Sequence, residues 1–165
     1  MSLIELPYDL PGRVFRSAMP FSTYDPHRKL FLDYQRERIS AIVLLADDSE
    51  CNRITGFDLR NFYLNQGMEV IHLPIPDFGI PRIVNLIDAV ALTSTRARQG
   101  HNLVVHCHAG IGRTGMVAAC LAVYNLGFSS DKAISWVRER IPGAIEAPEQ
   151  IRMIDLYAVG GSEVC

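Results

Sequence analysis

Two short apolar runs limit the fold most strongly: residues 41–45 (AIVLL) and residues 103–105 (LVV), which lie inside the predicted strand 102–106 (NLVVH). A strand with one solvated face alternates apolar and polar residues, whereas a run without alternation is typical of a strand that is buried on both faces. Strands of that kind occur almost only in parallel sheets covered by helices on both sides. The two runs therefore favour an α/β fold.

The segments around these runs agree with that fold class. Further strands are predicted at 13–16 and 69–73, and Leu30, Phe31 and Tyr34 recur at helical spacing after the helix-starting pair Asp25-Pro26. Longer helices are predicted over 56–65, 81–98, 113–126, 130–140 and 148–158. Strands that alternate with helices predict a central, mostly parallel sheet flanked by helices.

Length and charge exclude several classes of protein. A chain of 165 residues without an internal repeat or a long linker is expected to form a single domain, residues 1–165. Its net charge of −2 gives no general attraction to nucleic acid or to an anionic membrane. No apolar run approaches the roughly 18 residues that cross a bilayer, and the N-terminus does not resemble a signal peptide. We expect no membrane span.

The cysteines indicate the compartment. Cys51, Cys107, Cys120 and Cys165 are widely spaced and form no CxxC pair. That usage fits thiols in a reducing compartment better than a disulfide framework, so we expect a cytoplasmic protein.

Residues 104–115 (VVHCHAGIGRTG) place a glycine-spaced loop at the end of one of the apolar runs. Glycines allow the backbone to approach a ligand closely, and successive N–H groups can then surround an anion. The helix predicted after the loop directs its positive end at the same point, and the guanidinium of Arg113 matches two oxygens of a phosphate. The predicted phosphate-binding residues are His108, Ala109, Gly110, Ile111, Gly112 and Arg113.

Cys107 lies between the strand and this loop, where ligands bind to parallel sheets. The positive field of the loop favours its thiolate, which makes Cys107 a candidate nucleophile beneath a bound phosphoryl group. Thr114 is placed to donate a hydroxyl hydrogen bond to the sulfur. A buried structural thiol is the alternative reading of Cys107.

Residues 106–115 (HCHAGIGRTG) resemble the signature of the cysteine-dependent protein phosphatases, which is a Cys, five residues, an Arg and then Ser or Thr. Residues 13–20 (RVFRSAMP) also resemble the opening strand of the compact dual-specificity members. The resemblance implies the phosphatase fold, with the phosphate loop between a strand and a helix. It also implies a phosphocysteine intermediate and no cofactor.

Two further residues are assigned through that resemblance. Departure of an alkoxide or phenoxide needs a proton from a general acid. Asp77, in the segment PIPDFGIP, resembles the acid of the family's mobile loop, although Pro-Asp is also ordinary turn chemistry. Residues 140–150 resemble the segment that supplies a water-orienting glutamine, which would be Gln150 here. Glu146 stands where some relatives carry another Gln.

Other polar residues have plainer interpretations. Adjacent residues of a strand point to opposite faces, and no other Cys or His lies at zinc-site spacing, so His106, Cys107 and His108 predict no metal site. His106 is read as a core residue that holds the geometry near the nucleophile. The acidic run 47–50 is expected to be a solvated loop, or else to pair one carboxylate with Arg113. Whether Cys51 or Cys120 forms a redox disulfide with Cys107 stays open.

The favoured function is therefore a phosphoprotein phosphatase that hydrolyses phosphotyrosine, with phosphoserine and phosphothreonine left open as further substrates. The chain is too short for the larger tyrosine-specific domain. Ile111 and His108 replace residues that are basic in phosphoinositide-directed relatives, so a lipid substrate is less favoured. A phosphorylated protein or peptide is the expected partner. The alternatives are a sulfurtransferase, which would not require Asp77, and a phospho-binding module built on an inactive phosphatase. The oligomeric state is not predicted.

Overall fold

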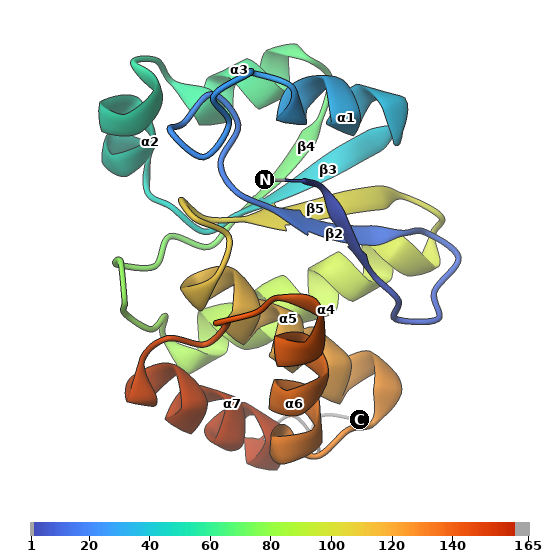
Figure 1. The fold of residues 1–165 in the computed structure, drawn as a ribbon. Coiled ribbons are helices and arrows are strands. Elements are labelled where there is room, and N and C mark those ends of the chain that lie inside the picture. Colours follow the sequence, from blue (N-terminus) through green and yellow to red (C-terminus); the bar gives the residue numbers. More distant parts are fainter. Residues whose placement is uncertain (1, 161–165) are drawn as a thin grey trace.

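The computed structural model describes residues 2–160, which form a sheet between two layers of helices (Figure 1). The sheet has five strands in the order β1-β2-β5-β3-β4, and each pair of neighbours is parallel except for β1 and β2. The strands are β1 (Ile4–Leu6), β2 (Val14–Ser17), β3 (Ile39–Leu44), β4 (Glu69–His72) and β5 (Asn102–His106). The prediction of a mostly parallel sheet flanked by helices is confirmed.

The helices divide into two groups, one on each face of the sheet (Figure 1). The first group is α1 (Leu30–Arg36), α2 (Asp48–Thr55) and α3 (Leu59–Asn65). The second is α4 (Ile83–Arg98), α5 (Gly112–Leu126), α6 (Ser130–Arg140) and α7 (Pro148–Gly160). Within residues 2–160 no helix combines the length and apolarity needed to cross a membrane.

The central strand explains why its sequence does not alternate. Val104 of β5 belongs to the apolar cluster beneath the first group of helices, whereas Leu103 and Val105 belong to the cluster beneath the second group. All three side chains are fully buried. Because helices cover both faces, every position along the strand favours an apolar residue.

Helix α5 follows β5 directly and is the most buried helix of the described chain. Its residues from Gly112 to Ala122 are all buried, and α4, α6 and α7 pack around it. A helix that is apolar on all sides needs such an environment. The strand and helix on either side of the glycine-spaced loop are therefore both held in the core.

Three elements differ from the sequence-based prediction. The short strand β1 was not predicted. The interpretation of residues 47–50 as a loop is wrong, because Asp47 caps the first turn of α2 by accepting a hydrogen bond from the backbone N–H of Glu50 at 2.7 Å. The predicted helix 56–65 is also too long: Gly56, at φ 83°, ends α2, and Asp58 caps a new helix, α3.

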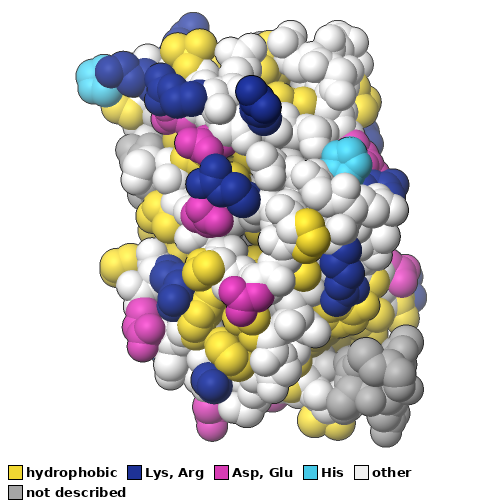
Figure 2. Space-filling view, turned by 90° about the vertical axis from the view of Figure 1, so that its right-hand side faces the viewer, with side chains coloured by type: hydrophobic (Ala, Val, Ile, Leu, Met, Phe, Trp, Pro, Cys, Tyr) yellow, Lys and Arg dark blue, Asp and Glu magenta, His cyan; other side chains and the backbone are white. Residues whose placement is uncertain are grey.

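The face at the far end of the sheet from the glycine-spaced loop carries basic and acidic side chains side by side (Figure 2). It lies on the right of Figure 1, where β5 begins. Such mixed charge produces no large field of one sign, in contrast with what an anion site needs.

The hairpin between β1 and β2 generates a test of the fold. The backbone N–H of Gly12 donates to Ala97 O at 2.7 Å, and a Cβ added to Gly12 would lie 2.0 Å from His101 O. We expect Gly12→Ala to lower the free energy of unfolding by about 2 kcal/mol, and the melting temperature by roughly 5 °C, because backbone atoms cannot yield easily.

Gly160→Ala is the matched control for thermal denaturation, because among the described residues a Cβ on Gly160 would contact nothing within 4 Å. Equal melting temperatures for the two variants would show that the hairpin moves aside at little cost, against this account of the packing.

Candidate active site

The sulfur of Cys107 lies at the end of β5, where the loop 107–112 turns into α5. The hydroxyl of Thr114 donates a hydrogen bond to this sulfur at 3.2 Å, and the backbone N–H of Gly110 donates another at 3.3 Å. Only 3% of the Cys107 surface is exposed. Two donors at this distance stabilise negative charge on sulfur, which is the form that acts as a nucleophile.

The carbonyl groups of the loop are hydrogen bonded on its outer side by the end of β2. The N–H of Met19 donates to His108 O at 2.8 Å, and the guanidinium of Arg16 donates to Gly110 O, with Nε at 3.1 Å. The two elements that close this contact are distant in sequence but neighbours in the sheet.

The direction of the carbonyls fixes the direction of the N–H groups. The described peptide bonds are all trans, so each N–H points away from the carbonyl of its own peptide unit. Because His108 O and Gly110 O face outward, the N–H groups of Ala109 and Ile111 face the other way, toward the space above Cys107. The loop therefore presents donors to one side, as an anion-binding loop requires.

Gly110 is the position where this turn depends on glycine. Its φ is +76°, a conformation that L side chains rarely adopt, and an added Cβ would lie 2.2 Å from the backbone oxygen of Ser17. A side chain at Gly110 would push the loop away from β2.

Arg113 is held rigidly in the first turn of α5. Its Nη1 and Nη2 donate to the two carboxylate oxygens of Glu50 at 2.7 and 2.8 Å, and Nη1 also donates to Ile75 O at 3.0 Å. Burial by itself would lower the pKa of Arg113, but its hydrogen bonds to Glu50 and the nearby negative charges raise the pKa above its usual value. The predicted pairing of this acidic run with Arg113 is confirmed, and Glu50 provides the carboxylate.

Asp77 extends over the same guanidinium. Its Oδ1 lies 3.2 Å from Arg113 Nη2, and its side chain is 61% exposed. The loop that carries it makes a tight turn, in which the N–H of Gly79 donates to Pro76 O at 2.8 Å and Phe78 has a φ of 56°. An exposed carboxyl group opposite a buried thiol is suitably placed for proton exchange with a substrate lying between them.

His106 is a core residue, as its sequence position suggested. Its Nδ1 lies 3.0 Å from Cys107 O, which can only accept, so this nitrogen carries the proton. Nε2 then accepts from the hydroxyl of Tyr63 at 2.8 Å. Burial lowers the pKa of His106 to about 4, so the ring is neutral at physiological pH and fixes the backbone at Cys107.

Gln150 is buried and its amide group is already engaged. Oε1 accepts from the N–H groups of Glu146 and Ala147 at 3.0 and 3.3 Å, and Nε2 lies 3.4 Å from Gly79 O. The side chain therefore ties the start of α7 to the loop of Asp77. It lies beside Gly112, but Glu146 rather than Gln150 lines the cavity above Cys107.

A cavity of about 100 Å³ opens above the sulfur, with aromatic side chains at its mouth. The ring of Tyr24 meets that of His108 edge to face, with centroids 5.0 Å apart, and His108 Nε2 is buried without a hydrogen-bond partner among the described residues. Burial lowers the pKa of His108. The cavity is lined by Tyr24, Asp77, Phe78, Cys107, His108, Ala109, Gly112, Arg113 and Glu146.

The remaining described cysteines are buried free thiols, Cys51 and Cys120. Burial and the neighbouring carboxylates raise the pKa of Cys51 to about 12, and burial raises the pKa of Cys120 as well. Both stay protonated at neutral pH, which makes them weak nucleophiles. Cys165 lies outside the described residues.

Several residues of the site were not predicted as such. Asp47 and Glu50 have the spacing of a helix capping box, a signal that would have revealed α2 and hence the position of Glu50. Arg16, Tyr24 and Phe78 reach the site through the tertiary structure, and no local pattern marks them.

Comparison with known proteins identifies related sequences. The family model "Polymorphic toxin system, DSP-PTPase phosphatase" matches residues 22–126. Protein tyrosine phosphatase domain-containing protein 1 from Danio rerio is 31% identical over 105 residues, which are 63% of this chain and 15% of that protein. Cyclin-dependent kinase inhibitor 3 from Rattus norvegicus is 34% identical over 146 residues, 86% of this chain and 65% of that protein. The chain thus spans only part of these relatives.

Solved structures agree with the fold. Tk-PTP in its active form is 32% identical, with a TM-score of 0.76 over 90% of this chain and 92% of that chain. Kinase associated phosphatase has a TM-score of 0.83 over 97% of this chain and 95% of that chain, at 22% identity, which is a likeness of fold alone.

The pair between Glu50 and Arg113 generates a prediction about stability and binding. Glu50→Gln keeps the size of the side chain but leaves the buried charge of Arg113 without its counter-ion. We expect the free energy of unfolding to fall by about 3 kcal/mol and the affinity for inorganic phosphate to fall about tenfold. Chemical denaturation and calorimetric titration measure the two effects.

Asp48→Asn is the matched control, because it removes one charge from the same turn of α2. Asp48 pairs with Arg60 at the surface, where both side chains are more than 40% exposed. Its loss should cost less than about 1 kcal/mol. Equal stabilities of the two variants would contradict a structural role for the buried pair.

Proposed function

The chain belongs to the DSP-PTPase family of cysteine-dependent phosphatases, and from this membership we propose that it is a phosphoprotein phosphatase acting through a phosphocysteine intermediate. One observation carries the proposal. The sulfur of Cys107 receives two hydrogen bonds at the floor of a donor-lined cavity, with Arg113 and Asp77 on the opposite side. A nucleophile, an anion clamp and an acid are thereby gathered around the space of one phosphoryl group.

In the first step the thiolate of Cys107 attacks phosphorus, and the bond to the leaving oxygen breaks. Arg113 and the inward N–H groups stabilise the charge on the three remaining phosphoryl oxygens. Asp77, protonated, gives its proton to the leaving oxygen, so that an alcohol or phenol departs. The phosphoryl group is then covalently bound to sulfur.

In the second step a water molecule attacks phosphorus, the bond between sulfur and phosphorus breaks, and inorganic phosphate forms. Asp77, now a carboxylate, takes the proton of the water. The hydrogen bond from Thr114 stabilises the departing thiolate. We assign Gln150 to this step because its side-chain oxygen accepts hydrogen bonds from the backbone N–H groups of Glu146 and Ala147, and so positions this segment beside Gly112.

The walls of the cavity favour phosphotyrosine as the substrate group. Tyr24 and Phe78 offer aromatic surface at the mouth, and Phe78 is 61% exposed. Two carboxylates, Asp77 and Glu146, line the cavity alongside one cation, Arg113. This balance suits a single phosphate and opposes a polyanionic lipid headgroup. Phosphoserine and phosphothreonine are included in the proposal as second substrates.

The proposed cellular compartment follows from the thiolate chemistry. A thiolate that must stay reduced is best served in a reducing compartment, so we place the protein in the cytoplasm, acting on phosphorylated proteins or peptides rather than nucleic acid. We also propose that residues 1–165 form one dual-specificity-like phosphatase domain. The pairing of β2 with β5 and the packing of α7 on α5 support that organisation.

The first test of the proposed function replaces the nucleophile. We expect Cys107→Ser to abolish hydrolysis of p-nitrophenyl phosphate, because a hydroxyl of ordinary acidity is a poor nucleophile in the same position. Binding of inorganic phosphate should persist, because the loop donors and Arg113 remain. The measurements are a colorimetric rate and a calorimetric titration.

Cys120→Ala serves as the control, because Cys120 is buried in α5 and contributes nothing to the cavity lining. It should keep nearly full activity. A Cys107→Ser variant with a tenth of the wild-type rate would contradict the phosphocysteine mechanism, and a wild type that binds phosphate without turnover would favour a binding module.

The second test concerns the acid. Asp77→Asn should slow hydrolysis of a phosphotyrosine peptide by about 10²–10⁴-fold, because tyrosinate needs a proton to leave. A fluorinated aryl phosphate, whose phenol is acidic, should be slowed far less.

Asp155→Asn, an exposed carboxylate on α7, provides the matched control and should leave both rates unchanged. Equal losses on the two substrates in Asp77→Asn would show that Asp77 shapes the loop and does not deliver the proton.

A further inference from the structure

Two arginines are buried among residues 2–160, and only one of them faces the cavity. Arg113 lines the cavity, whereas Arg16 lies on β2 behind the phosphate loop with 3% of its surface exposed. Removing a guanidinium from water is costly, so its position calls for a compensating role. Its sequence context, a short strand, gives no indication of one.

The guanidinium of Arg16 donates two hydrogen bonds to one atom of the loop, the carbonyl oxygen of Gly110. Both Nε and Nη2 donate to Gly110 O, the former at 3.1 Å. This oxygen belongs to the peptide unit whose N–H is that of Ile111. A cation at the carbonyl end polarises the unit and makes the N–H at the other end a stronger donor toward an anion above Cys107.

The same contact bears on the sulfur. The N–H of Gly110 donates to Cys107 Sγ, and Gly110 packs directly on the backbone of Ser17, the neighbour of Arg16. Gly110 therefore accepts from Arg16 through its carbonyl oxygen and donates to the Cys107 sulfur through its N–H. Burial lowers the pKa of Arg16, and the nearby Cys107 and Tyr34 oppose part of that lowering.

We infer that Arg16 is a positioning residue of the phosphate loop: it fixes the Gly110 carbonyl on the outer side and places a second positive charge behind the sulfur. The inference rests on the proposed function in that Cys107 is taken as the nucleophile. It extends that function, because Arg16 lies outside the cavity and contacts no substrate. If Arg16 served packing alone, an apolar side chain of similar length would replace it without consequence for the chemistry.

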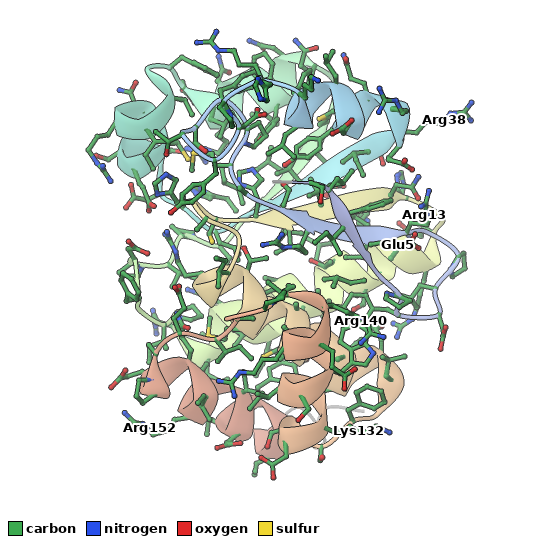
Figure 3. The ribbon with its side chains drawn as sticks, in the orientation of Figure 1. Glu5, Arg13, Arg38, Lys132, Arg140 and Arg152 are labelled. Atoms are coloured by element: carbon green, nitrogen blue, oxygen red, sulfur yellow. The ribbon has the colours of Figure 1, made fainter. Side chains whose placement is uncertain are left out.

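Arg16→Met and Arg16→Lys separate these roles. Methionine keeps much of the side-chain volume of arginine and removes the positive charge and both N–H donors. Lysine keeps the charge and loses the planar guanidinium that donates twice to one oxygen. The matched control is Arg13→Met on the same segment. Arg13 lies at the outer end of the β1–β2 hairpin beside Glu5 (Figure 3), and its pairs with Glu5 and Glu37 are exposed.

Two measurements test the role of Arg16 without depending on catalytic turnover. The first is the pH dependence of Cys107 alkylation by iodoacetamide, followed by mass spectrometry of the peptide. In Arg16→Met we expect the midpoint of the alkylation profile to rise by about one pH unit relative to the wild type. In Arg16→Lys the midpoint should lie between those of Arg16→Met and the wild type. The second is the affinity for inorganic phosphate, which should fall about tenfold in Arg16→Met. Arg13→Met should match the wild type in both.

The outcomes are decisive. An Arg16→Met protein that is folded by circular dichroism and matches the wild type in both readouts overturns the inference. If Arg16→Met does not fold, Arg16→Lys decides: several-fold weaker phosphate binding supports the inference and unchanged binding overturns it. A wild type that fails to hydrolyse phosphotyrosine while Arg16→Met shifts both readouts would refute the proposed function and leave the role of Arg16 standing.

Discussion

An anion can rest on the N–H groups of residues 108–113 only if the carbonyls of the same residues are hydrogen bonded elsewhere, because a buried carbonyl without a partner is costly. The sheet meets this constraint through its strand order. Since β2 lies directly beside β5, its continuation at Met19 reaches His108 O, and Arg16 reaches Gly110 O. The donor face of the loop is therefore set by contacts on its opposite face, before any ligand arrives.

A second set of contacts joins the loop to Asp77, the proposed general acid. Arg113 donates to Glu50 of α2 through Nη1 and Nη2, approaches Asp77 through Nη2, and donates to Ile75 O through Nη1. One buried cation thus connects elements from both faces of the sheet. The candidate site depends on this cation for the placement of the loop that carries Asp77 as well as for its charge.

The local parts of the site were predictable because they are adjacent in sequence. The spacing of Cys107, Arg113 and Thr114 determines a turn and the first turn of a helix, and the structure brings Thr114 to the sulfur. The sequence admits two roles for Glu50, a solvated loop residue or a partner of Arg113, because only the helix α2 determines which way its carboxylate is presented. Arg16 could not be found from its neighbours, since its contact with Gly110 exists only after β2 and β5 pair. Sheet order is a property of the whole chain.

That order also governs how the molecule assembles. Val14 of β2 pairs with Leu103 of β5, and β3 pairs with β5 on the other side, so the strand between them is the last of the five to be synthesised. Until it emerges, the β1–β2 and β3–β4 pairs have no shared neighbour and expose their inner edges. Pairings between distant segments form slowly because the intervening chain must first be closed into a loop. The insertion of β5 completes the sheet and, at the end of the same strand, creates the proposed phosphate loop, so the sheet is completed and the thiol of Cys107 is placed in the same step.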